Sequence, residues 1–431
     1  MASLNKIKIK GFGNIGEVNL NLQQITALLA PNNYGKSNVL EALLFGLNFI
    51  QQTPQLRQKM MEFEPYISVN KHIAGNPFVF EIEGSIDENT DFQYGYSFEW
   101  RRNRNIHAAS VSGVINGEFL RLKPKTGGKP KFSTVVNRAD SSVAKYTPSQ
   151  TGRCDKALAI DGYDLVLNKL SNFDDLFYHQ HIQSIRKICI IDADYLSDPR
   201  TFFAFRMVRD EKRKYLEGGP IATYLFSLKK EDPDTFSLLI SAVTLLIPTI
   251  ESIEPVVVSS NNLQVDEDAP FELSNQYDIV VKEKHNNQQT SFLYLSTGSM
   301  KLLYLLTTIV RASREGVQLL LVEELENSIH PSLLHSLLSV LKDFLGDTKL
   351  LFTSHSPNLV KYMSASQLYV GLPSDKGIAD FRTIKPSKVK SVLQIAGAGD
   401  MALGEYLFKL MLEAESDTDI IDHFFISQKE A

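Results

Sequence analysis

Residues 30–37, Ala-Pro-Asn-Asn-Tyr-Gly-Lys-Ser, have the types and spacing of a loop that binds phosphate. Such a loop presents backbone N–H groups at a helix N-terminus, and Gly35 lets the backbone approach the anion closely. Lys36 would reach the β- and γ-phosphates of a nucleotide, and the Ser37 hydroxyl would be a ligand of Mg²⁺. Ala30 stands where the full pattern has glycine. The loop predicts a nucleotide site, and the alternative is a polar turn between a strand and a helix.

Residues 295–299, Leu-Ser-Thr-Gly-Ser, stand directly before an apolar segment with helical spacing. Ser296 and Gly298 could offer a hydroxyl and a close backbone N–H to an anion at the positive end of a helix dipole. This predicts a second anion site. The alternative is an ordinary helix cap, because serine and threonine are favoured at that position.

Two adjacent carboxylates, Glu323 and Glu324, follow the apolar run 319–322. Carboxylates at the end of a buried strand are costly unless they face a metal or solvent. In phosphoryl transfer, Glu323 would help to hold hydrated Mg²⁺, and Glu324 would polarise the attacking water as a general base. The alternative is that both side chains simply leave the sheet for solvent.

His355 follows the apolar run 349–353, one strand-helix-strand unit after the two glutamates. That spacing would place Glu324 and His355 at one edge of a parallel sheet, and His355 could contact a γ-phosphate or its attacking water. A structural histidine is the alternative. Residues 187–194 also end in acidic residues, Asp192 and Asp194. No Leu-Ser-x-Gly-Ser element precedes them, so they do not fit the role given to Glu323 and Glu324. A separate metal site is the interpretation left for them.

The elements that must position these residues indicate an α/β protein. Residues 25–30 form an apolar run typical of a strand buried on both sides, and apolar residues after Lys36 recur at helical spacing. Residues 76–122 alternate with period two, which predicts an antiparallel sheet, and residues 123–150 have the composition of an exposed loop. Residues 155–250 are mostly of helical spacing, with one strand expected at 186–191. Strands alternating with helices at both ends predict a parallel core with an insertion.

Composition excludes several classes of protein. The 431 residues carry 45 Lys+Arg and 50 Asp+Glu, a formal charge of −5, and only two cysteines, which excludes a disulfide framework and a Cys-x-x-Cys zinc ribbon. No apolar run approaches the roughly 18 residues of a membrane span. The N-terminal residues lack the apolar region of a signal peptide, so a cytoplasmic location and no membrane partner are expected.

The four motifs, in this order, resemble those of ABC-type ATPases. The long separation between the first two motifs resembles that in the RecF, SMC and OLD branch. The motif sequences also resemble that branch: PNNYGKSNVLEAL, LSTGSMK, LLLVEELENSIHP and LFTSHSP. The resemblance covers residues 1–50 and 290–365 and looks closest to the stand-alone OLD-like ATPases of bacterial anti-phage and abortive-infection systems. It implies a P-loop ABC-type core with an antiparallel β lobe and a central helical insertion.

The resemblance implies ATP and Mg²⁺ as cofactors, with Lys36, Glu324 and His355 catalytic and with Ser37 and Glu323 at the metal. It also implies a homodimer or higher oligomer that closes on ATP. In such a dimer the Leu-Ser-x-Gly-Ser segment of one chain, called the signature, faces the nucleotide bound by another chain. The matching positions are Walker A Asn32, Asn33, Tyr34, Gly35, Lys36, Ser37 and Asn38, signature Ser296 and Gly298, Walker B Glu323 and Glu324, D-loop Asn327 and Ser328, and switch His355. The glutamine of the Q-loop is not placed, since neither Gln180 nor Gln183 fits well, and Phe12 is suggested as an adenine contact.

Four segments are expected from motif and composition. Residues 1–150 hold Walker A and the β lobe, 151–254 a mainly helical insertion with one core strand, 255–384 the remaining motifs, and 385–431 a C-terminal helical tail. Residues after His355 show no nuclease motif, and Asp417, Asp419 and Asp422 have the pattern of a solvated acidic tail.

The leading functional hypothesis is an ATPase that senses an infection cue and controls a separately encoded effector, a nuclease or a toxin. The alternatives are a RecF-like ATPase of DNA repair or recombination and a scaffold that binds ATP without turnover. Residues 101–131 hold eight Lys or Arg residues and one acidic residue, Glu118, a net charge of +7. This stretch predicts contact with DNA phosphates, and a solvated loop is the alternative. Its basic residues are Arg101, Arg102, Arg104, Arg121, Lys123, Lys125, Lys129 and Lys131.

Overall fold

A computed structural model describes residues 2–62, 69–100, 113–125, 131–193, 221–258, 276–372, 376–413 and 418–426. The chain divides into two compact units. Unit 1 comprises residues 1–190, 316–321 and 347–431, and unit 2 comprises residues 191–315 and 322–346. This division follows compactness, whereas the four expected segments follow motif and composition, so those segments stay a prediction.

Unit 1 is built around two sheets. Its helices are α1 (Lys36–Gln51), α2 (Pro54–Met60), α3 (Val166–Leu170), α4 (His179–Arg186), α9 (Pro357–Val360), α10 (Val389–Ala398), α11 (Leu403–Glu413) and α12 (Thr418–Phe424). Its strands are β1 (Ser3–Phe12), β2 (Ile15–Asn21), β3 (Ile25–Leu29), β4 (Phe78–Ser85), β5 (Thr90–Phe98), β6 (Ile115–Pro124), β7 (Ser133–Arg138), β8 (Val143–Tyr146), β9 (Lys156–Ala159), β15 (Lys349–Ser354), β16 (Leu368–Leu372) and β17 (Asp380–Arg382). Strands β10 (Ile190–Asp192) and β14 (Leu319–Val322) begin in unit 1 and end at the first residues of unit 2.

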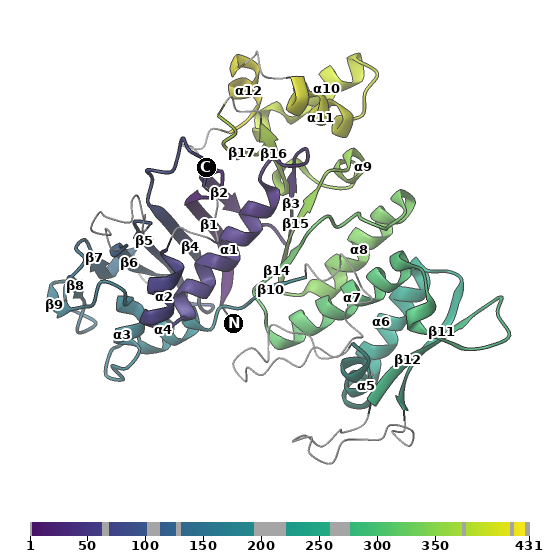
Figure 1. Ribbon diagram of the computed structural model, residues 1–431, viewed down its shortest axis with the longest axis horizontal. Coiled ribbons are helices and arrows are strands. Elements are labelled where there is room, and N and C mark those ends of the chain that lie inside the picture. The colour runs from purple at the N-terminus through teal and green to yellow at the C-terminus, as the bar shows by residue number, and fades with distance from the viewer. Residues whose placement is uncertain are drawn as a thin grey trace, which may run out of the picture. The chain divides into compact units, whose positions relative to one another are not determined.

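The first sheet has eight strands in the order β2-β1-β4-β5-β6-β7-β8-β9, and each pair is antiparallel. Along β4 the residues alternate between buried and half-buried, as in a sheet with one covered face. Helix α1 lies across that face (Figure 1), and Tyr96 donates its hydroxyl to the Gly46 carbonyl at 2.7 Å. The expected antiparallel lobe is thereby confirmed. The expected loop at 123–150 is wrong in part, because residues 133–146 pair as β7 and β8.

The second sheet has six strands in the order β10-β14-β15-β3-β16-β17. Strand β3 pairs in parallel with β15 on one side and with β16 on the other, and β17 is an antiparallel edge strand. Every residue of β3 and of β16 is buried, and the apolar run at residues 25–30 predicts this for β3. This sheet confirms the α/β class. The strand expected at 186–191 is wrong at its start, because α4 extends to Arg186 and β10 begins at Ile190.

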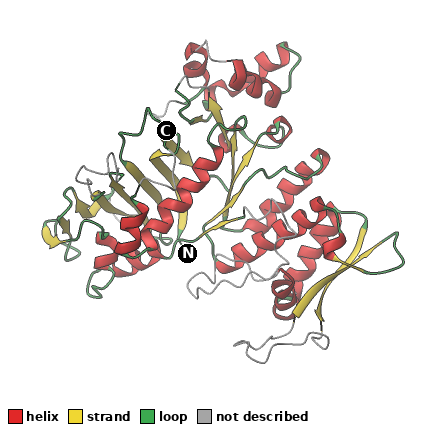
Figure 2. Ribbon diagram, in the orientation of Figure 1, coloured by secondary structure: helices red, strands yellow, loops and turns green. Residues whose placement is uncertain are grey.

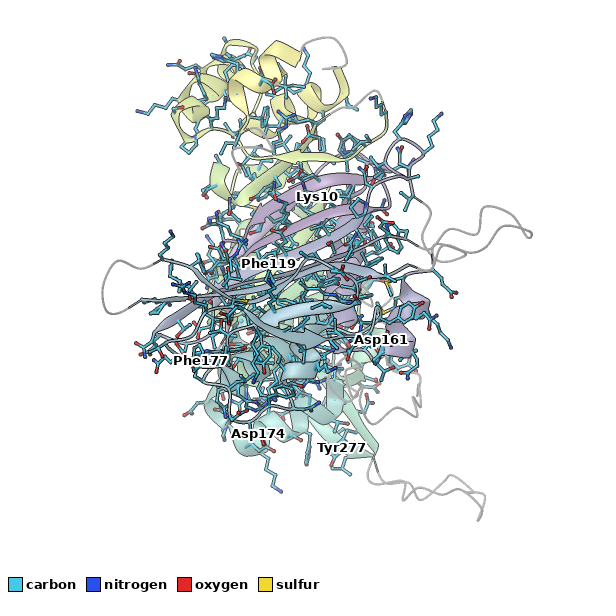
Figure 3. The ribbon with its side chains drawn as sticks, turned by 90° about the vertical axis from the view of Figure 1, so that its left-hand side faces the viewer. Lys10, Phe119, Asp161, Asp174, Phe177 and Tyr277 are labelled. Carbon is cyan, nitrogen blue, oxygen red and sulfur yellow. The ribbon has the colours of Figure 1, made fainter. Side chains whose placement is uncertain are left out.

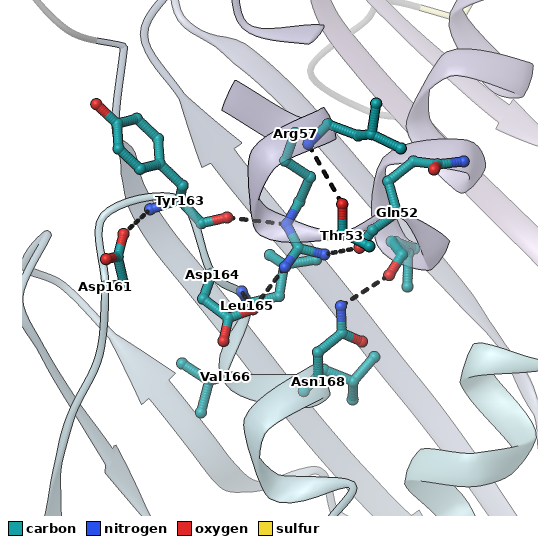
Figure 4. A network of polar contacts seen from close by, with 12 residues as sticks. Gln52, Thr53, Arg57, Asp161, Tyr163, Asp164, Leu165, Val166 and Asn168 are labelled. Carbon is teal, nitrogen blue, oxygen red and sulfur yellow. Dashed lines mark hydrogen bonds and ion pairs between the residues drawn. The ribbon is translucent and has the colours of Figure 1, made fainter. Parts of the chain in front are cut away.

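Arg57 ties the end of the α1–α2 region to the loop before α3 (Figure 4). Its side chain is fully buried, and its guanidinium donates to the carbonyls of Tyr163 and Gln52 and to the Asp164 carboxylate. Asn168 adds a bond from its amide to the Ile50 carbonyl at 3.0 Å. A buried guanidinium is tolerated only when its donors are satisfied, so this network fixes the far end of α1.

Unit 2 packs helices around α7 (Thr297–Glu315), which is buried over residues 300–310. Helices α6 (Pro233–Leu246) and α8 (Leu334–Leu345) contact α7, and α5 (Ile221–Glu231) packs on the antiparallel hairpin of β11 (Ile250–Val258) and β12 (Gln276–Glu283). Figure 2 shows these helices in red and the hairpin in yellow. A two-residue strand, β13 (Thr290–Ser291), completes this sheet. None of the helices in the described residues is long and apolar enough to cross a bilayer.

Candidate nucleotide site

The loop between β3 and α1 is shaped for an anion. Gly35 precedes the first residue of α1 with φ 108° and ψ 17°, a left-handed conformation that glycine adopts freely. A Cβ built on it would lie 2.3 Å from Asn14 Oδ1, so a side chain does not fit there. The first turn of α1 carries no acidic residue and no side-chain cap, so its N–H groups can receive a phosphate at the positive end of the helix dipole.

The Lys36 side chain lies inside the same loop. Its side chain is 7 % exposed, and its Nζ donates to the carbonyls of Ala30 at 2.8 Å and Pro31 at 2.9 Å. The ammonium group is therefore held against the loop that would surround the phosphates. Loop shape and charge together fit a nucleotide phosphate.

Asn14 holds this loop in place, and the sequence interpretation missed it. Its Nδ2 donates to the Tyr34 carbonyl at 3.0 Å, and its Oδ1 accepts from Asn38 Nδ2 at 2.8 Å. Asn38, expected at the nucleotide, thus uses its amide to hold Asn14. The only signal in the sequence was an asparagine inside the turn between β1 and β2, where asparagine is common for conformational reasons alone.

Ala30 is accommodated because Gly371 has no side chain. Ala30 is fully buried, and a Cβ built on Gly371 would lie 2.7 Å from the Ala30 Cβ and 2.8 Å from the Tyr34 ring. The Tyr34 ring packs edge-on against Phe381 at 5.8 Å between centroids. Tyr34 can therefore offer a phosphate its backbone N–H, while its ring belongs to the fold.

His355 lies at the same edge of the sheet as the loop. It follows the last residue of β15, Ser354, which is in register with Leu29 at the end of the parallel strand β3. Ala30 donates its backbone N–H to the Ser354 carbonyl at 3.4 Å, and His355 itself is exposed. Unit 1 thus brings together Lys36, its loop and His355.

Unit 2 brings together the second motif and the loop after Glu323. Ser296 Oγ accepts from the Ser299 N–H at 3.1 Å, so it caps α7, as the alternative interpretation has it. A Cβ built on Gly298 would lie 2.3 Å from the Ser328 carbonyl oxygen. Only a glycine allows the start of α7 to pack this closely on the loop that carries Ser328.

The carboxylate loop has an unusual backbone. Glu324 has φ 44° and Ser328 has φ 63°, values that residues with a Cβ seldom adopt. The Glu324 carbonyl accepts from the Asn327 N–H at 2.8 Å and from Lys301 Nζ at 3.0 Å. The sequence interpretation did not select Lys301, and its signal was one lysine inside an otherwise apolar stretch of α7.

Lys301 is almost completely buried, with 2 % of its side chain exposed. Burial lowers its pKa to about 8, although the nearby charges of Glu326 and Glu324 act in the opposite direction. Burying a lysine costs desolvation free energy. The hydrogen bond from Lys301 to the Glu324 carbonyl offsets part of that cost.

Phe12 and Gln183, considered as an adenine contact and a Q-loop residue, both have structural roles. Phe12 as an adenine contact is wrong, because it is 3 % exposed and packs among the rings of Phe45, Phe78 and Trp100. Gln183 donates to the Ser171 carbonyl at 3.2 Å within unit 1, which is a structural role. Its candidacy as the Q-loop residue gains no support.

The basic stretch is partly neutralised where the structure describes it. Lys123 and Lys125 pair with Asp91 at 2.9 and 3.3 Å, and Arg121 lies over the Phe119 ring. Arg101, Arg102, Arg104 and Lys129 lie outside the described residues.

The face of the first sheet that carries Lys10 and Phe119 (Figure 3) has a groove of about 510 Å³. Lysines, one arginine and glutamates line this groove together, and Lys10 pairs with Glu17 at 2.7 Å. The described part of the lobe is therefore of mixed charge.

Among the described residues, no three His, Cys, Asp or Glu side chains gather into a metal site. Asp192 ends β10, and Asp194 lies outside the described residues. Ser37 in unit 1 and Glu323 in unit 2 each carry an oxygen atom of the kind that Mg²⁺ binds.

Replacing Gly298 tests the contact between α7 and the carboxylate loop. We expect Gly298→Ala to abolish ATP turnover, because the new Cβ meets the Ser328 carbonyl and displaces the loop that carries Glu324. ATP binding should be retained, because the loop of Lys36 is not altered. Turnover and binding of a fluorescent ATP analogue measure the two effects. Gly397→Ala is the control, since a Cβ on Gly397 meets nothing within 4 Å. Normal turnover in Gly298→Ala would contradict the prediction.

The family model described as "AAA domain, putative AbiEii toxin, Type IV TA system" matches residues 25–361. No curated protein matches the chain significantly. Solved structures that are similar in fold include three SMC head domains. One, described as the SmcHead bound to the C-winged helix domain of ScpA, is 15 % identical, with 90 % of this chain and 99 % of that chain covered and a TM-score of 0.44.

The SMC head domain from Thermotoga maritima is 12 % identical, with 89 % of this chain and 99 % of that chain covered and a TM-score of 0.40. The third structure is the Smc head domain with an extended coiled coil, bound to the C-terminal domain of ScpA derived from Pyrococcus furiosus. It is 12 % identical, with 92 % of this chain and 100 % of that chain covered and a TM-score of 0.41. TM-scores below 0.5 are too low to transfer any property to this chain.

Proposed function

This chain belongs to the AAA domain family just described, and we propose that it binds ATP with Mg²⁺ and hydrolyses it at a site completed by a second copy of the chain. The observation that carries the proposal is the loop at the start of α1. Gly35 leaves no room for a Cβ there, and Lys36 is held inside the loop by the carbonyls of Ala30 and Pro31. A backbone cradle with one buried cation fits the phosphates of a nucleotide.

Each residue has a distinct part in the proposed reaction. The N–H groups at the start of α1 bind the phosphates, and Lys36 turns its ammonium to the β- and γ-phosphate oxygens. Ser37 and Glu323 would hold Mg²⁺, which when bound neutralises developing charge on the phosphate oxygens. Glu324 orients the attacking water and accepts its proton, and His355 donates a hydrogen bond to the γ-phosphate.

The second copy supplies the start of α7. This helix has no acidic residue in its first turn, and Ser296 and Gly298 stand at its N-terminus. In the proposed homodimer, that end of α7 faces the γ-phosphate held by the partner's loop, as the resemblance to ABC-type ATPases implies. ATP would then close the dimer and hydrolysis would open it.

In the cell, we propose that this cycle controls a separately encoded nuclease or toxin in the cytoplasm during phage infection. Two supports are the resemblance to OLD-like defence ATPases and the family description, which names a toxin of a toxin–antitoxin system. A repair ATPase that binds DNA through residues 101–131 gains no support from Lys123 and Lys125, which pair with Asp91.

Hydrolysis by the purified chain tests the proposal directly. We expect release of phosphate from ATP in the presence of Mg²⁺ and none after the Mg²⁺ is removed with EDTA, followed by recovery when excess Mg²⁺ is added. A chain that binds ATP but releases no phosphate would be a scaffold rather than an ATPase. A chain that does not bind ATP would contradict the whole proposal.

A further inference from the structure

Lys301 links the start of α7 to the backbone of Glu324. Its Nζ donates to the Glu324 carbonyl at 3.0 Å from the second turn of the helix, and its side chain is 2 % exposed. An ammonium group is seldom placed so deep, because its desolvation is costly unless a specific bond compensates for it. The carbonyl that it meets belongs to the residue proposed as the general base.

Glu324 needs such support because of its backbone. With φ at 44° the residue is in a left-handed conformation, which persists only where its surroundings impose it. Two donors hold its carbonyl, the Asn327 N–H at 2.8 Å from within the loop and Lys301 Nζ from the helix. Holding this peptide restricts the backbone of Glu324 and with it the direction of the Cα–Cβ bond from which the side chain starts.

The same stretch of α7 contacts the loop a second time. A Cβ on Gly298 would come within 2.3 Å of the Ser328 carbonyl, so the first turn of the helix packs directly on the far end of the loop. The two contacts, at Gly298 and at Lys301, bracket the loop from Glu324 to Ser328. A shift of α7 would therefore move this loop with it.

We propose that Lys301 is a positioning residue that couples the start of α7 to the orientation of Glu324. This inference rests on the proposed ATPase function. When Ser296 and Gly298 engage a nucleotide, Lys301 holds the Glu324 peptide in the orientation that aims the carboxylate at the water. In this role Lys301 acts through the backbone of Glu324 rather than on the nucleotide itself.

Lys301→Met tests this role, because methionine keeps the apolar stem and removes the donor. We expect turnover to fall at least tenfold, with the KM for ATP within twofold of the wild type, since the loop of Lys36 is not altered. The thermal midpoint should not fall, because the Glu324 carbonyl keeps the Asn327 N–H. Hydrogen exchange of peptides covering residues 323–330 should become faster, while exchange of those covering 30–38 should not change.

Lys349→Met is the matched control. Lys349 is a half-buried lysine whose pKa is lowered by burial, and its Nζ also donates to a backbone carbonyl, that of Leu22, at 3.0 Å. It begins β15, at the opposite end of that strand from His355. Removing it should leave turnover and exchange of residues 323–330 unchanged.

The outcomes separate this inference from the function on which it rests. Loss of turnover in Glu324→Gln together with normal turnover in Lys301→Met would overturn the role of Lys301 alone. Unchanged hydrogen exchange of residues 323–330 in Lys301→Met would overturn it as well. A wild type without turnover would instead overturn the proposed function. Equal losses of stability and of ATP affinity in Lys301→Met would make Lys301 a general structural residue and would also overturn the inference.

Discussion

Glu324→Gln is expected to reduce ATP turnover by roughly 10²–10⁴-fold, the usual contribution of a general base. Glutamine has nearly the same shape, and the backbone of residue 324 stays held by Asn327 and Lys301, so the loop should keep its conformation. The amide cannot accept the proton of the attacking water. ATP should therefore still bind and close the dimer, and the closed state should accumulate because hydrolysis no longer opens it.

Two measurements check this result. Phosphate release gives the loss of turnover, and light scattering with ATP should show a mass about twice that of the single chain in the variant. Glu315→Gln is the control, because Glu315 ends α7 in a partly exposed pair with Arg311 and has no role at the site. Unchanged turnover in Glu324→Gln would remove Glu324 as the base. An unchanged mass with ATP, from a starting state that is monomeric, would contradict the closure cycle.

The arrangement of the fold could be predicted where a motif and its flanking elements agree. The apolar run before Lys36 and the helical spacing after it give strand, loop and helix, and the apolar run before His355 gives a neighbouring strand. From the sequence, His355 was expected at one edge of a parallel sheet with Glu324. The structure places His355 at the carboxyl edge of β15 beside the end of β3, where the loop of Lys36 begins.

Contacts made across long separations could not be predicted in this way. Asn14 supports a loop that is 20 residues away, and Lys301 reaches a carbonyl 23 residues away. Neither contact leaves a periodic pattern, since each depends on one side chain meeting one backbone atom. Phe12 failed as an adenine contact for a related reason. A glycine-rich turn does not fix the direction of an aromatic ring, and this ring turns into the core beside Phe78.

Lys36→Ala is expected to weaken ATP binding by roughly 10- to 100-fold, because charge-assisted hydrogen bonds contribute about 1.5–3 kcal/mol and each 1.4 kcal/mol is a factor of ten. The side chain is 7 % exposed, so its ammonium would meet the phosphates in a setting with little solvent to screen it. Titration with a fluorescent ATP analogue measures the affinity. Turnover should fall with it, since the same charge stabilises the transferring phosphoryl group.

Lys349→Ala distinguishes this effect from the loss of any buried or half-buried lysine. Lys349 donates to the Leu22 carbonyl at 3.0 Å and to Asn5 Oδ1 at 2.9 Å, from the first residue of β15. Both lysines hold backbone carbonyls, so both alanine variants lose comparable bonds within the fold. Only Lys36 begins the helix whose N-terminus would bind the phosphates. An equal loss of ATP affinity in the two variants would mean that general destabilisation, and not a missing phosphate contact, explains Lys36→Ala.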